Sequence, residues 1–277
     1  MNTINIEHLS RYYGEGKGIF DISFHVKQGE VFGFLGPNGA GKTTTIRHLM
    51  GFLKPKSGTC MIDGMDCWKE RENIQEELGY IPGEISFFDD MSGTEFLKFI
   101  TKYRKTGTHN RQKELLERFD LDPKGKIRKM SKGMKQKLGI VTAFLHDPAI
   151  LILDEPTSGL DPLMQNRFID LIAEEKKRGK TILMSSHIFE EVERTCDRIG
   201  IIRKGKIVAV DSTLALRERH IRTYTVTLES ETAAQAFARD FNGTQNGRLV
   251  TVKPRQSLEE IFMNYYGDEK NDESDLI

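Results

Sequence analysis

The sequence predicts an α/β protein with a mixed sheet at its core. Strand-like and helix-like segments alternate along the chain, which is typical of this class. The segment Val31–Leu35 is apolar throughout, as expected for a strand that is covered on both faces. A glycine-rich turn follows this strand and leads into a helical stretch from Lys42 to Met50. Together these features predict a strand–turn–helix unit at the centre of the fold.

The flanking segments fill in the rest of this domain. Residues 3–9 and 20–27 predict strands of an N-terminal antiparallel part. The region 92–145 predicts a mostly helical insertion, which opens with Ser92 and Glu95 at capping-box spacing. Strand patterns return at 149–153 and 181–185, separated by a helix that begins after Asp161. A hairpin is expected at 199–210, around Lys204-Gly205.

A second, smaller region begins near residue 213. Residues 223–228 and 249–252 predict strands, and residues 231–241 between them predict a helix. Ser257 and Glu260 repeat the capping-box spacing ahead of a further apolar stretch. The acidic residues 267–277 predict a disordered tail. We therefore expect a domain over 1–212, an accessory α+β unit over 213–266, and the tail 267–277.

Composition narrows the class of protein. The 277 residues carry 41 basic and 41 acidic side chains, a balance that argues against a nucleic-acid partner. The 3 cysteines are odd in number and none of them has CxxC spacing, which favours a reducing compartment over a disulfide framework or a zinc site. The N-terminal residues do not resemble a signal peptide, and no run approaches the ~18 apolar residues of a membrane span. We expect a cytoplasmic protein whose membrane role depends on a partner chain.

The glycine-rich turn has the pattern of a phosphate-binding loop. Its residues follow GxxxxGK[ST] between a strand and a helix, where backbone N–H groups and the helix N-terminus converge on phosphate oxygens. Lys42 is expected to reach the β- and γ-phosphates, and Thr43 to ligate magnesium. The alternative, a glycine-rich turn with a surface lysine, is disfavoured by this context. The expected nucleotide-binding residues here are Gly36, Pro37, Asn38, Gly39, Ala40, Gly41, Lys42, Thr43 and Thr44.

Two carboxylates end the predicted strand at 150–153. Any parallel strand can end in acidic residues, so Asp154 and Glu155 would mean little alone. Downstream of a phosphate loop they have specific roles: Asp154 is expected to hold magnesium, and Glu155 to orient or polarise the attacking water. The two motifs together predict a P-loop NTPase cassette.

Further motifs make the chain resemble the nucleotide-binding subunits of ATP-binding-cassette transporters across nearly all of residues 1–212. The run from Asp154 to Asp161, Asp-Glu-Pro-Thr-Ser-Gly-Leu-Asp, matches the family's magnesium strand and following loop. Ser131-Lys132-Gly133-Met134 stands where the family has its signature, and Ser185-Ser186-His187 where it has its switch histidine.

The resemblance implies how these residues act. Two such cassettes, identical or merely similar, would pair head to tail, with each ATP between one phosphate loop and the partner's signature. Tyr13 would stack on adenine, although Tyr12 or Tyr13 could instead pack at a strand end. His187 would contact the γ-phosphate beside the catalytic Glu155 and Lys42. Asp161 would act across the dimer, and it can cap its helix as well.

The chain departs from the family pattern at two places. The signature, usually Leu-Ser-Gly-Gly-Gln, is Met-Ser-Lys-Gly-Met here; Ser131 and Gly133, which approach the γ-phosphate, are kept. The magnesium-sensing glutamine is replaced by Gly83. Glycine has backbone freedom that could present Glu84 to the metal instead, or Glu84 could simply face solvent.

The resulting functional prediction is an ATP- and Mg²⁺-dependent ATPase that powers a separate membrane permease, in the class of drug, antibiotic or polypeptide exporters. It would be peripheral on the inner face of the membrane. The alternatives are a translation or DNA-repair ATPase, which usually has two cassettes or a long coiled coil, and a regulatory nucleotide-binding module without turnover.

Overall fold

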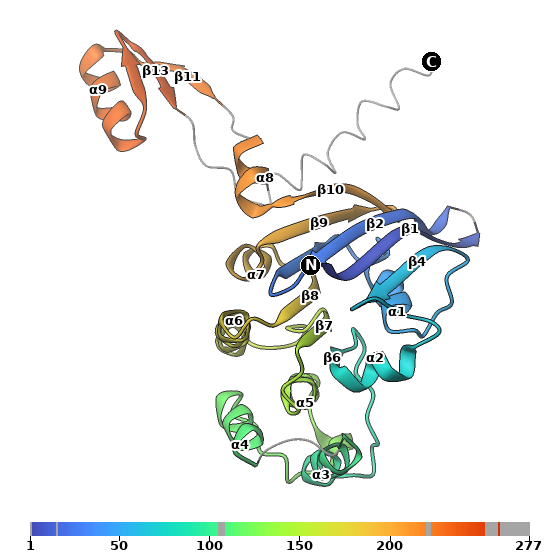
Figure 1. Ribbon diagram of the computed structural model, residues 1–277. Coiled ribbons are helices and arrows are strands. Elements are labelled where there is room, and N and C mark those ends of the chain that lie inside the picture. Colours follow the sequence, from blue (N-terminus) through green and yellow to red (C-terminus); the bar gives the residue numbers. More distant parts are fainter. Residues whose placement is uncertain (1, 15, 105–108, 220–222, 253–259, 261–277) are drawn as a thin grey trace. The chain divides into compact units, whose positions relative to one another are not determined.

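The computed structural model describes residues 2–14, 16–104, 109–219, 223–252 and 260, in two compact units that divide after Val210 (Figure 1). Each unit is described by itself below. The predicted capping box at Ser257 includes a residue outside the described ranges, and the predicted tail 267–277 lies wholly outside them.

The first unit is built on a six-stranded sheet whose strand order is β10-β9-β3-β8-β7-β6. The pairs β3–β8, β3–β9, β7–β8 and β6–β7 are parallel. Strands β3, β7 and β8 are buried along their whole length, as the apolar run at β3 predicted. The strands are β3 Val31–Leu35, β6 Leu78–Ile81, β7 Ile150–Asp154, β8 Thr181–Ser186, β9 Arg198–Arg203 and β10 Lys206–Ser212.

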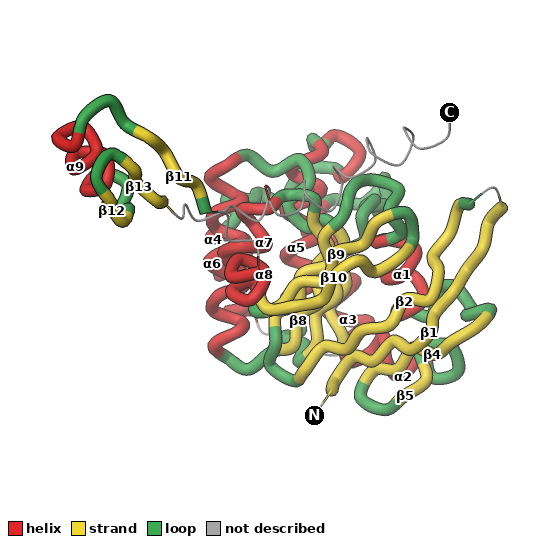
Figure 2. Tube along the Cα trace, turned by 90° about the horizontal axis from the view of Figure 1, so that it is seen from above, coloured by secondary structure: helices red, strands yellow, loops and turns green. Residues whose placement is uncertain are grey.

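A second, antiparallel sheet has the order β2-β1-β4-β5. Figure 2 shows its long strands β1, β2 and β4 side by side. Its strands are β1 Asn2–Gly14, β2 Lys17–Lys27, β4 Ser57–Ile62 and β5 Met65–Asp66. Helix α1, Lys42–Leu49, packs against β2 and β4 of this sheet and against β7 of the other, so it lies between the two sheets. The phosphate loop is thereby held by core packing on both sides.

Helices occupy the remaining faces and one end of the main sheet. Helix α7, Phe189–Thr195, packs on β3 and β8 and against α6, Pro162–Lys177. The helices between β6 and β7 gather at one end of the sheet, green in Figure 1: α3 Gly93–Arg104, α4 His109–Arg118 and α5 Lys132–Phe144. Their first turn has the predicted capping box, in which Ser92 N donates to Glu95 Oε2 at 2.6 Å and Glu95 N to Ser92 Oγ at 3.2 Å.

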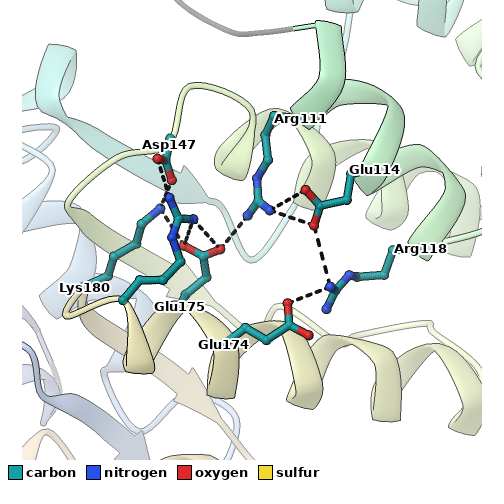
Figure 3. A network of polar contacts seen from close by, with 8 residues as sticks. Arg111, Glu114, Arg118, Asp147, Glu174, Glu175 and Lys180 are labelled. Atoms are coloured by element: carbon teal, nitrogen blue, oxygen red, sulfur yellow. Dashed lines mark hydrogen bonds and ion pairs between the residues drawn. The ribbon is translucent and has the colours of Figure 1, made fainter.

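A network of ion pairs ties α4 to the core (Figure 3). At its centre is Glu175 on α6, whose side chain is 1% exposed. Its carboxylate contacts Arg111 of α4 at 2.5 Å, Arg178 at 3.0 Å and Lys180 at 2.5 Å. Arg178 and Lys180 also pair with Asp147, in the loop before β7. Buried charges that are paired this closely fix the relative position of the elements that carry them.

The second unit, from Asp211 onward, contains a three-stranded antiparallel sheet of order β11-β13-β12. Helix α9 covers it through a small apolar core of Ala234, Val250 and Val252. Ser230 caps α9 by accepting a hydrogen bond from Ala233 N at 3.1 Å. The elements are α8 Thr213–Arg219, β11 Tyr224–Thr227, α9 Glu231–Asp240, β12 Thr244–Asn246 and β13 Leu249–Val252.

The α/β fold class and the mixed sheet are confirmed. The elements that sequence analysis did not identify are short, polar or both, such as β4 with Ser-Gly-Thr at its start, and α2, Arg71–Glu77, which has one buried residue. Such segments have too little hydrophobic periodicity to be distinguished from loops.

Candidate functional site: a phosphate loop beside paired carboxylates

The loop between β3 and α1 has the backbone that phosphate binding requires. Gly39 and Gly41 have φ angles of 79° and 112°, in a region that favours glycine. A Cβ at Gly41 would also lie 2.7 Å from Ile19 Cγ2, so no other residue fits there without movement. Gly41 is the N-cap of α1 and provides no side-chain cap. The first N–H groups of α1 therefore remain available to an anion, with the helix dipole behind them.

Lys42 is buried at the base of the loop, with 4% of its side chain exposed. Its Nζ donates to Gly36 O at 2.6 Å and to Pro37 O at 3.1 Å, and it lies 3.2 Å from Glu155 Oε1. The ammonium group is therefore held by polar contacts to the first residues of the loop and to Glu155, and a ligand can replace these contacts. Phosphate oxygens can replace the carbonyl oxygens as its acceptors.

A cavity of about 330 Å³ adjoins the loop. It is lined by most of the predicted nucleotide-binding residues, which come from β1, the loop and α1. Residues at the start of β2 and just after β7 complete the lining. Its lining comprises Tyr13, Lys17, Gly18, Asn38, Gly39, Gly41, Lys42, Thr43, Thr44 and Glu155. Tyr13 is 53% exposed, so its ring is open to stacking, and Arg11 lies 5.4 Å from the ring centroid. The other predicted loop residues, Gly36, Pro37 and Ala40, are absent from this lining.

Asp154 and Glu155 are adjacent in the chain, but their carboxylates have different surroundings. Asp154 is fully buried, and its Oδ1 accepts a hydrogen bond from Ser185 Oγ at 2.5 Å. Its Oδ2 is buried without a hydrogen-bond partner among the described residues. A carboxylate oxygen left in this way is suited to a hard cation. Burial, and then the charge of Asp154, raise the pKa of the neighbouring Tyr80 to about 12, so that phenol stays neutral.

Glu155 connects the predicted catalytic residues. Its φ angle is 48°, an uncommon conformation for a side chain of this size, and it is held by hydrogen bonds from Glu155 N to Ser185 Oγ and Ser185 O. Its Oε1 contacts Lys42, and its Oε2 lies 3.3 Å from His187 Nδ1. The turn after β7 thus places one carboxylate between the lysine and the histidine.

The signature residues lie elsewhere, at the N-terminus of α5, where they pack against the loop that follows Glu155. Ser131 caps α5 by accepting from Met134 N at 3.2 Å, and Lys132 Nζ donates to Ser158 Oγ at 3.1 Å. A Cβ at Gly133 would lie 2.9 Å from Gly159 O, so glycine permits this close packing. Ser131 to Met134 are absent from the lining of the phosphate-loop cavity.

Asp161 occupies the end of the same loop. It is the N-cap of α6, and its Oδ1 accepts a hydrogen bond from Met164 N at 3.0 Å. The predicted capping role is therefore present. Asp161 is exposed, so capping leaves its side chain accessible to another molecule.

Gly83 lies directly beside Asp154, the carboxylate expected to hold magnesium. A Cβ at this position would be 3.0 Å from Asp154 Oδ2. Gly83 does not have a positive φ angle, so the expected use of glycine's backbone freedom is wrong: the glycine instead leaves space next to Asp154. Glu84 is exposed, and it is not part of the cavity lining.

Sequence analysis missed three contributors to this site. Lys17 and Gly18 line the cavity from the start of β2, because β2 pairs with the end of β1 that carries Tyr13. The signal available was a basic residue and a glycine shortly after Tyr13. Ser185, quoted only as part of a motif, holds both Asp154 and Glu155 N.

Comparisons with known proteins agree with this geometry. The ABC transporter family model matches residues 19–158. The chain is 42% identical over 214 residues to the bacitracin transport ATP-binding protein BcrA of Bacillus licheniformis, covering 75% of this chain and 69% of that protein.

Solved structures are similar as well. One ATP-binding subunit of an ABC transporter has a TM-score of 0.71 and 32% identity, covering 78% of this chain and 92% of its own. A bacterial ABC transporter cassette, solved as a dimer, has a TM-score of 0.68 and 21% identity, covering 76% and 98%. The chain belongs to the ABC transporter family, in which it is the ATP-hydrolysing, ATP-binding subunit of a transporter.

Proposed function

We propose that two copies of this chain, or one copy and a similar cassette, bind two ATP molecules between them and drive export through a separate membrane permease. The observation that carries this proposal is an incomplete site. Lys42, Glu155 and His187 form one chain of contacts, two of them on the phosphate-loop cavity, while Ser131 and Gly133 lie away from its lining. A second cassette facing the cavity would supply the missing signature residues. The dimeric cassette structure supports this arrangement.

In this arrangement hydrolysis transfers the γ-phosphoryl group of ATP to water. The bond between the γ-phosphorus and the bridging oxygen breaks as water attacks, giving ADP and phosphate. Lys42 and the N-terminus of α1 hold the β- and γ-phosphates. Glu155 orients the water and receives its proton, and His187, next to Glu155, contacts the γ-phosphate. The exposed ring of Tyr13 stacks on adenine.

The residues present fit a magnesium ion. Asp154 Oδ2 is a buried carboxylate oxygen without a partner among the described residues, and the hydroxyl-bearing Thr43 lines the same cavity as Lys42. Asp154 and Thr43 would hold the ion, which when bound neutralises charge on the β- and γ-phosphates.

Mixing two inactive variants tests the shared site. Lys42→Ala removes the phosphate lysine but keeps the signature, and Ser131→Arg blocks the signature but keeps the lysine. Each variant alone is expected to lack turnover. In a mixed dimer one site has both an intact Lys42 and an intact Ser131, so mixing restores up to roughly a quarter of wild-type activity. No recovery, with mixed dimers shown by cross-linking, would refute a site shared between chains.

A surface for the permease is suggested by aromatic side chains that face solvent. Phe88, Phe99 and Tyr103 are 56%, 43% and 75% exposed, and they form a continuous cluster with ring-centroid distances of 5.9 Å and 6.3 Å. Clustered exposed aromatic residues are typical of interaction sites. None of the described helices is long and apolar enough to cross a membrane.

This docking surface is separate from the chemistry and can be tested separately. Phe99→Ala combined with Tyr103→Ala is expected to leave the ATPase rate of the isolated subunit unchanged and to abolish its stimulation by the permease. Unchanged stimulation would place the permease elsewhere.

The name of the relative supports an antibiotic or peptide as the exported compound. The subunit reconstituted with its permease in vesicles is expected to hydrolyse ATP faster when a peptide antibiotic is added. If no antibiotic or peptide in a tested panel raises the ATPase rate, this class of exported compound is excluded. The assignment as an ATPase does not depend on that result.

A further inference from the structure

Strand β8 ends in two consecutive serines, Ser185 and Ser186, whose hydroxyl groups form hydrogen bonds with different residues. Successive side chains of a strand point to opposite faces of the sheet. Ser185 Oγ bonds to Asp154 and to Glu155 N, on the side of the carboxylates. Ser186 Oγ instead donates to Glu191 Oε2 at 2.6 Å and accepts from Ile188 N at 2.9 Å. His187 follows the two serines and lies between Ser186 and Ile188, which this last hydrogen bond joins.

His187 itself is weakly held. Its side chain is 48% exposed, and its Nδ1 approaches Glu155 Oε2 at 3.3 Å. The position of the imidazole therefore depends on the backbone on either side of it. That backbone is fixed by the hydrogen bond from Ile188 N to Ser186 Oγ, and the Ser186 hydroxyl is oriented by Glu191.

We propose that Glu191 is a positioning residue for ATP hydrolysis, which acts through Ser186 to hold His187 against Glu155. The Glu191 carboxylate accepts a hydrogen bond from the Ser186 hydroxyl. The lone pairs of Ser186 Oγ are then free to accept the hydrogen bond from Ile188 N. Without Glu191, Ser186 Oγ can turn toward Ile188 O, 3.4 Å away, and the turn that carries His187 loses its anchor. This inference rests on the role proposed above for His187.

Stability alone does not explain a carboxyl group at this place. Glu191 is 3% exposed, and its Oε1 is buried without a hydrogen-bond partner among the described residues. Burial, with a smaller contribution from the charge of Glu155, raises the pKa of Glu191 to about 7, against the lowering effects of the Ser186 hydroxyl and, less strongly, the nearby Thr157 hydroxyl. Such a group costs folding free energy, and a well-packed apolar residue of similar size is often neutral or stabilising in its place.

A cavity of about 210 Å³ adjoins Glu191. It is lined from α6 by Pro162 and Gln165 and from the loop after Glu155 by Thr157. Glu191 thus lies between the loop that ends in Asp161 and the turn that carries His187. A side chain fixed here can keep both segments in register with the catalytic carboxylate.

The test compares Glu191→Leu, which keeps the volume but removes the acceptor, with Glu191→Gln, which keeps an acceptor oxygen. We expect Glu191→Leu to lower kcat by about tenfold or more, with KM for ATP and the melting temperature nearly unchanged, since small misplacements of catalytic groups cost up to ~100-fold. Glu191→Gln should restore most of the rate. Ser186→Ala should resemble Glu191→Leu. The matched control is Glu190→Leu on the same helix, where the side chain is 78% exposed.

A double-mutant cycle with His187→Ala, measured in single-turnover assays, decides whether Glu191 acts through His187. We expect Glu191→Leu to have no further effect in the His187→Ala background. Equal losses in both backgrounds, or a loss in Glu191→Leu that appears in KM instead of kcat, would overturn the inference. A wild-type rate in His187→Ala alone would instead overturn the role of His187 proposed above, whatever Glu191 does.

Discussion

Replacing Glu175 with glutamine should strongly destabilise the cassette. Glu175 is 1% exposed and meets three cations, Arg111, Arg178 and Lys180 (Figure 3). The change keeps the shape of the side chain but removes its charge, so these cations lose the central carboxylate that they share. Removing one partner of a buried ion pair costs about 3–5 kcal/mol of unfolding free energy, because the remaining charge is uncompensated.

The neighbouring residue provides the control. Glu174 lies next to Glu175 on α6, but it is 51% exposed, and its ion pair is with Arg118. Glu174→Gln should cost only ~0.2–1 kcal/mol, the usual value for an exposed pair. For a unit of this size, 1 kcal/mol lowers the melting temperature by about 2–4 °C. The expected shifts in calorimetry are therefore roughly 6–20 °C for Glu175→Gln and at most ~4 °C for Glu174→Gln.

Acid should remove the same stabilisation from the wild-type protein. Burial opposes ionisation of Glu175, but the hydrogen bond and charge of Lys180, with Arg111 and Arg178, outweigh it and lower the pKa. In Asp147, hydrogen bonds and charges from Arg178 and Lys180 likewise overcome burial, lowering the pKa from 3.8 to about 2. A lowered carboxyl pKa stabilises the folded state above the unfolded pKa, and this stabilisation is lost as pH falls through the folded pKa.

We therefore expect the wild-type unfolding free energy to decrease as pH falls from 3.8 toward about 2, where Asp147 titrates. Glu175→Gln should show a shallower decrease than wild type, since one of the two carboxyl groups no longer titrates. Equal melting temperatures for Glu175→Gln and Glu174→Gln at neutral pH would refute the argument that burial makes this network costly to break.

Three further predictions concern the site and the second unit. Lys42→Ala should lower ATP hydrolysis by about 100-fold or more in a coupled phosphate-release assay, because it removes the buried charge at the phosphates; wild-type turnover would contradict the assignment. Glu84→Ala should lower hydrolysis and raise the magnesium requirement if the exposed Glu84 acts as a metal ligand beside Gly83, and superimposable magnesium titrations would leave Glu84 as a solvated residue. A chain truncated after residue 212, which retains β10, should bind ATP by fluorescence titration with unchanged affinity; a folded truncation without binding would show that the accessory unit completes the site.

The sequence by itself determined the phosphate loop and the order of the main elements. A loop that binds phosphate with its own backbone needs consecutive residues of specific types, so the glycines, Lys42 and Thr43 are visible as a local pattern. The same holds for the capping box at Ser92 and Glu95, and for the apolar strand before the loop. These features depend on neighbours in the chain, and the structure contains the loop, the cap and the strand where the sequence predicted them.

Only the tertiary structure decided which distant residues meet. Ser185, Lys17 and Glu191 have no distinctive spacing relative to the loop. Strand pairing brings Ser185 to Asp154, the β1–β2 hairpin brings Lys17 to the cavity, and the packing of α7 on β8 brings Glu191 to Ser186. Gly83 could be noticed as a departure, but not as the residue that leaves space beside Asp154. Long-range packing determines which side chains face one another across strands, helices and loops. Local hydrophobic periodicity carries no information about these contacts.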